Sequence, residues 1–143
     1  MIYLQLKFKN HDLKPLNTLL TELKIKGASV NRARYRIVQL LEAQSKTLTH
    51  DSQALVSEYA SRDVSGNPII KDNNYQIDPV KQVEFSKASN ELMNEPLLIT
   101  VDDYVPQLKK LYAFINEYDG ELEGTSAYAF GVFLDALEDA GIK

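Results

Sequence analysis

The first nine residues alternate between apolar and polar side chains, a pattern that predicts a strand with one buried face. In Ile2–Lys9 every even-numbered side chain is a large apolar one, and a period of two places these side chains on the same face. A second apolar run, Leu97–Val101, follows Pro96. Because neither strand can cover its buried face alone, we expect the two to pair.

Helical spacing dominates most of the chain. Leucines three and four residues apart predict a short helix that ends at Gly27: Leu13, Leu16, Leu20 and Leu23. A second helix begins at Ser29 or Asn31 and runs without glycine or proline to about Tyr59. Nearly thirty helical residues span about 45 Å at 1.5 Å per residue. Its centre is weak around Thr47–Thr49, where we consider a bend or break as the alternative.

Turn residues divide the second half of the chain. Ser65–Pro68 predicts a turn, followed by a short hairpin near 69–77. Asp78 and Pro79 predict a helix start, and that helix ends before Pro96. Asp102 or Asp103 is expected to cap a further helix, and a last one runs from about Ser126 to Gly141. We therefore predict a predominantly helical α+β fold with a small antiparallel sheet and four to five helices, in a single domain over residues 1–143.

Composition narrows the class of protein. The 143 residues are 44% hydrophobic and 25% charged, which is typical of a globular chain and excludes disordered, collagen-like and disulfide-rich classes. The absence of cysteine excludes thiolate catalysis and cysteine-based metal sites. No secretory signal or lipidation motif is recognised, and no apolar run approaches the ~20 residues that cross a bilayer. We expect a cytoplasmic protein that does not contact a membrane.

Few residues offer catalytic chemistry. The two histidines, His11 and His50, each precede an aspartate but lack metal-binding spacing. The carboxylate pair Asp102 and Asp103 is explained as helix caps rather than as a general base or a metal ligand. We expect no enzymatic activity, no cofactor and no metal.

The charges are segregated along the chain. Between Leu23 and Leu41 the chain has bases and no acid, whereas between Leu111 and Ile142 it has acids and no base. The basic patch consists of Lys24, Lys26, Arg32, Arg34 and Arg36. One interpretation is a phosphate-contacting surface. The favoured one is that basic and acidic regions face each other, with Arg32 or Arg36 in an ion pair inside the protein or its assembly, so nucleic acid is an unlikely partner.

The predicted long helix indicates a protein-binding surface. It exceeds what a domain of this size can cover, because the expected radius of gyration is only ~14.5 Å. We expect four apolar residues of its second half to remain partly free for another protein or a second copy: Leu48, Leu55, Val56 and Tyr59. The alternative is a break near Thr47–Thr49 that buries them all.

Several short motifs resemble an uncharacterised family of small proteins encoded by phages and prophages of Gram-positive bacteria. Beyond the first strand and the leucine helix, these motifs are Asn31–Arg34, Gly66–Pro68, Tyr75–Ile77, Asn90–Leu92 and Leu122–Tyr128. The resemblance implies a phage origin and no known activity. The function expected is that of a non-enzymatic phage accessory protein acting by protein–protein interaction: an assembly or minor virion factor, or an inhibitor of a host or defence protein. It would act in the host cytoplasm or on the virion; the alternative is a nucleic-acid-binding regulator that uses the basic patch.

Overall fold

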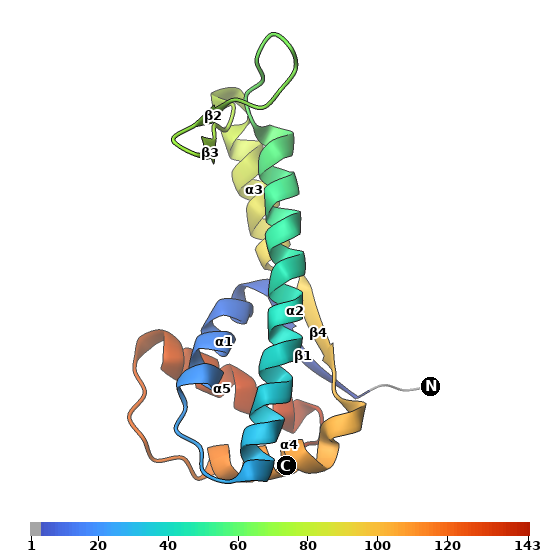
Figure 1. Cartoon of the computed structure of the whole chain (residues 1–143), viewed down its shortest axis with the longest axis vertical. Helices are drawn as coiled ribbons and strands as arrows, with labels where there is room; N and C mark the ends of the chain where they lie inside the picture. The colour runs from blue at the N-terminus through green and yellow to red at the C-terminus, as the bar shows by residue number, and fades with distance from the viewer. Residues whose placement is uncertain (1–3) are drawn as a thin grey trace. The chain divides into compact units, whose positions relative to one another are not determined.

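The computed structural model describes residues 4–143 and has the predicted α+β class (Figure 1). The predicted strand residues Ile2 and Tyr3 lie outside the described part. The chain divides into two compact units. Unit 1 is the described chain up to Ser45 together with Pro96–Lys143, and unit 2 is Lys46–Glu95. The prediction of a single domain stays a prediction.

In unit 1, strands β1 (Gln5–Lys9) and β4 (Pro96–Thr100) pair antiparallel, which confirms the expected pairing. Leu6 lies opposite Ile99 and Phe8 opposite Leu97. All four side chains are buried, whereas the residues that alternate with them in the two strands are exposed or half-buried. The alternation in the sequence therefore sets which face of the sheet meets the core.

Helices cover the buried face of this sheet. They are α1 (Leu13–Glu22), α4 (Val105–Asn116), α5 (Gly124–Asp139) and the first part of α2 (Ala28–Tyr59). α5 packs against both α1 and β1. The largest fully buried side chains come from every one of these elements and the C-terminus: Leu6, Leu16, Leu19, Leu20, Ile37, Leu41, Leu108, Leu111, Ile115, Phe133, Leu137 and Ile142.

α2 is unbroken from Ala28 to Tyr59, so the alternative of a break near Thr47–Thr49 is wrong. Two predicted helix boundaries also differ from the structure. α1 ends at Glu22, and Gly27, at φ 101°, instead precedes α2. α5 begins at Gly124, two residues before the expected start.

The predicted cap at Asp102 or Asp103 is wrong. The residues that precede the 3₁₀ turn at 102–104 and α4 are Val101 and Tyr104. The Leu4 N–H donates a hydrogen bond to Asp102 Oδ1 at 2.7 Å. The Asp102 carboxylate therefore holds the residue that precedes β1 in place. The two residues are 98 positions apart, so spacing along the sequence could not predict this contact.

Unit 2 contains the second part of α2, the predicted hairpin and α3 (Gln82–Met93). Strands β2 (Ile70–Lys71) and β3 (Asn74–Tyr75) pair antiparallel. Asp72 and Asn73 both have positive φ, at 52° and 63°, and this is the conformation that a tight two-residue hairpin turn requires. The predicted cap at Asp78 is found on the 3₁₀ turn at 79–81 that leads into α3, because the Val80 N–H donates to Asp78 Oδ1 at 3.0 Å.

Candidate functional site

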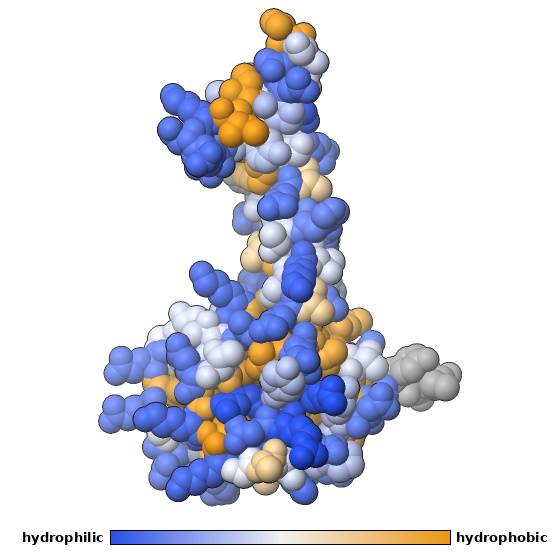
Figure 2. Space-filling model, in the orientation of Figure 1, coloured by the Kyte–Doolittle hydropathy of each residue, from blue (hydrophilic) through white to orange (hydrophobic). Residues whose placement is uncertain are grey.

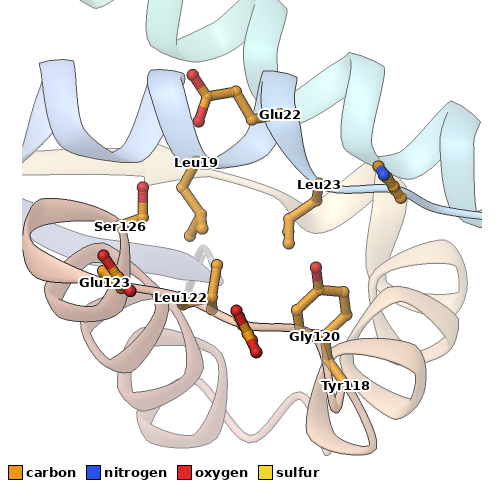
Figure 3. A pocket seen from close by; sticks show the side chains of 10 residues that line it. Leu19, Glu22, Leu23, Tyr118, Gly120, Leu122, Glu123 and Ser126 are labelled. Atoms are coloured by element: carbon orange, nitrogen blue, oxygen red, sulfur yellow. The ribbon is translucent and has the colours of Figure 1, made fainter.

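The first candidate is an open hollow of about 600 Å³ in unit 1. Leu19 of α1 and Leu23, the residue after that helix, point into it, and the Tyr118 hydroxyl faces them from the opposite side (Figure 3). Its remaining lining comes mainly from the loop 120–123 and includes Glu121 and Glu123. Glu22, Lys24 and Ser126 also line the hollow, so it combines apolar side chains with charged groups of both signs.

One residue of the basic patch, Arg34, is used in hydrogen bonds within unit 1. Arg34 donates hydrogen bonds to the carbonyls of Leu20, at 3.4 Å, and of Leu23, and to the Asn31 side-chain oxygen. It thereby satisfies backbone acceptors at the end of α1, where a cation also complements the helix dipole. Arg34 stabilises the junction between α1 and α2 and is not available to bind a phosphate.

Arg32 and Arg36 line a small hollow of about 140 Å³ with Asp103, Tyr104 and Gln107. The Arg36 guanidinium carbon lies 5.7 Å from the centre of the Tyr104 ring, a distance typical of a cation–π contact. Neither arginine forms an ion pair with a residue in 4–143. The ion pair expected inside the protein is therefore not formed by the described residues, and Lys24 and Lys26 are likewise exposed.

Two tyrosines are hydrogen bonded to carboxylates in unit 1. The Tyr128 hydroxyl donates to Asp12 Oδ1 at 2.7 Å, and the Tyr112 hydroxyl donates to Glu138 at 2.6 Å. These hydrogen bonds raise the pKa of Tyr128 and of Tyr112 above 10.0, because each holds the phenol in its protonated form. Asp12 is only 5% exposed and also accepts the Lys9 N–H at 3.0 Å. The hydrogen bonds of Asp12 therefore stabilise the fold of unit 1.

Unit 2 differs from unit 1 in having almost no core. Every residue from 46 to 95 is described, and Ala60 alone among them is buried. Six large apolar side chains in this unit are exposed: Val64, Ile69, Ile70, Tyr75, Val80 and Val83. Apolar surface is accordingly visible over its loop and hairpin (Figure 2). Most of the apolar surface of unit 2 therefore remains uncovered.

The helix pair of unit 2 carries two grooves. The neutral groove, about 810 Å³, includes Leu48, Val56, Phe85 and Met93, with Tyr75 and Ile77 from the hairpin region. The acidic groove, about 360 Å³, has the apolar residues Ala54, Leu55, Ala88 and Leu92 and the carboxylates Asp51, Glu58, Glu91 and Glu95.

The four predicted partner-binding residues do not form one surface. Leu48 and Val56 line the neutral groove, and Leu55 lines the acidic one. The Tyr59 ring packs against Phe85 with 5.9 Å between ring centres. All four are half-buried, which fits the partial exposure that we expected of them.

Sequence reasoning missed the contribution of α3 to both grooves. The signal was present, because residues 51, 54, 55 and 58 and residues 88, 91, 92 and 95 follow the same i, i+3, i+4, i+7 spacing. Each set combines two acids with two small or apolar side chains. The first set is a mixed stripe on α2, and the second lies on α3 except for Glu95, which follows the end of that helix. The pairing of the two sets into one groove is seen only in the structure.

The described residues contain neither a cluster that could hold a metal ion nor a helix that could cross a membrane. Within 4–143 no three His, Cys, Asp or Glu side chains are grouped so that they would hold a metal ion. None of the described helices is both long and apolar enough to cross a membrane. The predicted absence of catalysis and of cofactors stays a prediction.

Comparison with known proteins gives one match. A family model described as "Protein of unknown function (DUF1617)" matches residues 4–141, which is nearly the whole chain. No curated protein and no solved structure matches. The match assigns no activity to any residue.

Proposed function

We propose that this chain, which belongs to the DUF1617 family of proteins of unknown function, is a non-enzymatic accessory protein that binds another protein through unit 2. One observation carries the proposal. Unit 2 is built of two helices and a hairpin, and yet Ala60 is its one buried residue. Its helices present apolar side chains along two grooves instead of around a closed core.

The physical argument concerns how such a unit is stabilised. Isolated helices shorter than about 12–15 residues are marginal in water, and packing of an apolar face supplies most helix stability in proteins. α3 has 12 residues. Covering apolar area gains roughly 25 cal/mol per Å², and the exposed area in unit 2 offers that gain to a partner. A protein surface is the type of partner that supplies apolar area of this extent.

The biological setting that we propose follows from the resemblance to proteins of phages and prophages of Gram-positive bacteria. Such a protein would act in the host cytoplasm or on the virion. Two roles are consistent with a small binding protein: an assembly or minor virion factor, and an inhibitor of a host or defence protein. Family membership supports the resemblance only at the level of unknown function.

The test uses the full chain expressed in cells that carry the phage or prophage. Proximity labelling followed by mass spectrometry is compared for the wild type and for a Leu48→Glu, Leu55→Glu variant, which places one charge in each groove. A Thr18→Glu, Asn116→Glu variant adds the same charge at exposed positions of unit 1 and is the control. Specific partners lost only from the groove variant support the proposal. Retention of the same partners in a folded groove variant contradicts it.

Nucleic-acid binding is the second candidate, because Arg32 and Arg36 are exposed, one helical turn apart and without an ion pair among the described residues. Phosphate contacts weaken steeply as salt rises, whereas an apolar protein interface does not. Gel shifts at low salt with the wild type and an Arg32→Ala, Arg36→Ala variant separate the two functions. Tight binding that the variant loses would favour the nucleic-acid function.

A further inference from the structure

The acidic groove of unit 2 combines small and apolar side chains with carboxylates. Ala54 and Leu55 come from α2, and Ala88 and Leu92 from α3. Small side chains at a contact let helix axes approach toward the short end of the usual 8–10 Å range. Two packed helices with an open apolar seam between them are completed by a third helix laid along that seam.

The charges around the seam restrict what can occupy it. All eight lining residues are described, and four of them are carboxylates while none is Lys or Arg. Glu58, Glu91 and Glu95 are exposed and form no ion pair with a residue in 4–143. Asp51 contacts only the neighbouring His50 ring among possible cations, at 3.7 Å. An occupant with cations beside its apolar stripe would meet four unpaired or weakly paired carboxylates.

We propose that the acidic groove binds a single amphipathic helix of a partner protein, whose small and apolar stripe is flanked by Lys and Arg. This inference rests on the proposed function and specifies the chemistry of the partner. Complementary charges at the rim speed association and suppress partners of the wrong sign. Covering the apolar residues of the groove would supply the buried apolar area that unit 2 lacks.

A second copy of the chain is the less suitable occupant. Packing two acidic grooves face to face would bring eight carboxylates together without an intervening cation from the groove. Like charges held close together oppose association, most strongly at low salt. The partner helix therefore belongs to a different protein.

The test uses the full chain and three synthetic helical peptides, each about five turns long. They share one Leu and Ala stripe, and their flanking positions are Lys and Arg, Gln, or Glu. We expect the Lys/Arg peptide to bind at least about tenfold more tightly than the Gln peptide at low salt, a difference of about 1.4 kcal/mol. The Glu peptide should bind most weakly, and the preference should shrink as salt is raised.

Two variants locate the effect on the protein. Glu58→Gln combined with Glu91→Gln removes two of the four carboxylates, one from each helix, and should clearly reduce the preference for the Lys/Arg peptide. Glu42→Gln with Glu117→Gln removes the same charge at exposed positions of unit 1 and should leave the preference unchanged. Circular dichroism checks that each variant keeps its helices, and the salt dependence of the wild type tests the charges without any substitution.

The opposing outcomes separate this inference from the proposed function. Equal binding of all three peptides would overturn the charge preference while leaving unit 2 a docking surface. Failure of every peptide, with cellular partners still lost from the Leu48→Glu, Leu55→Glu variant, would overturn the helix as occupant and leave the proposed function standing. A dimer in light scattering that Leu55→Glu dissociates would identify a second copy as the occupant and overturn the inference.

Discussion

Asp12 is the residue on which the junction between β1 and α1 depends. It is buried, and its two oxygens accept the Lys9 N–H and the Tyr128 hydroxyl. Tyr128 lies in α5, so one carboxylate joins the first strand to the last helix. A buried acceptor that satisfies two donors is costly to remove, because both donors then lose their partner.

We expect Asp12→Ala to lower the free energy of unfolding by about 1–3 kcal/mol, the usual cost of leaving buried donors unsatisfied. Tyr128→Phe should cost less, since it leaves the Lys9 N–H satisfied. Tyr35→Phe is the control, because that hydroxyl is on a side chain 60% exposed. Urea denaturation measures all three, and an Asp12→Ala variant as stable as the control would refute the role of the carboxylate.

The same pair makes stability depend on alkaline pH. Tyr128 ionises near pH 10 in the unfolded chain, and the hydrogen bond to Asp12 raises its pKa in the folded chain. Folding is therefore favoured by this group below pH 10, and the contribution is lost as the pH rises through the folded pKa. The loss should be smaller in Tyr128→Phe than in the wild type, which unfolding measured between pH 8 and 11 will check.

Gly120 lies directly against the Tyr118 ring. A Cβ at residue 120 would lie 2.7 Å from Tyr118 Cε1 and closer still to the hydroxyl. We expect Gly120→Ala to displace this ring from Phe130, whose ring centre is 5.9 Å away. Aromatic NMR shifts and near-UV circular dichroism report the displacement. Gly131→Ala is the control, because its Cβ would meet nothing within 4 Å, and it should leave both signals unchanged.

At single residues, the sequence predicted burial in a strand but not contacts between distant polar groups. The alternation in the first strand predicted that Leu6 and Phe8 would be buried, since a period-two pattern contains that information by itself. The roles of Asp12, Arg34 and Asp102 were not predictable in this way. Asp12 meets Tyr128 across 116 positions and Asp102 meets the Leu4 N–H across 98, and one sequence does not encode which distant groups a polar side chain will reach.

At the scale of elements, the sequence predicted the features that depend only on neighbouring residues. Asp78 followed by Pro79 predicted the start of the helix, and Asp72 and Asn73 tolerate the positive φ of the hairpin turn. The continuity of α2 was correctly favoured because no glycine or proline interrupts it. The two grooves were not predicted, because they depend on which face of α3 meets which face of α2.

The cap of the 3₁₀ turn that leads into α3 offers a test at this scale. Asp78→Ala removes the acceptor of the Val80 N–H and should weaken the helix start by about 0.5–2 kcal/mol. Unit 2 has little buried area to compensate, so we expect faster amide exchange across residues 80–93. Asp78→Asn keeps a good capping oxygen and should restore slow exchange; failure of Asn to do so would show that the charge, rather than the acceptor, matters.

For the whole molecule, burial is divided unequally between the two units. Unit 1 contains all of the largest fully buried side chains, and unit 2 contains none of them. Local stability follows burial, since segments with few buried apolar contacts open at low free-energy cost. Regions that bind partners are commonly drawn from such segments, which is consistent with the function proposed for unit 2.

α2 allows this inequality to be measured within one helix. Its residues Ala33, Ile37 and Leu41 are almost fully buried in unit 1, whereas its residues beyond Ser45 belong to unit 2 and include no buried side chain. The backbone hydrogen-bond pattern is helical throughout, so a difference in amide exchange must come from packing. We expect slow exchange for residues 33–41 and exchange at least about tenfold faster for residues 46–59, a difference of about 1.4 kcal/mol in opening free energy. Binding of a partner helix should slow the second set and leave the first unchanged. Uniform protection up to Tyr59 in the free protein would show that unit 2 is stabilised without a partner and would remove the main support for its role in binding.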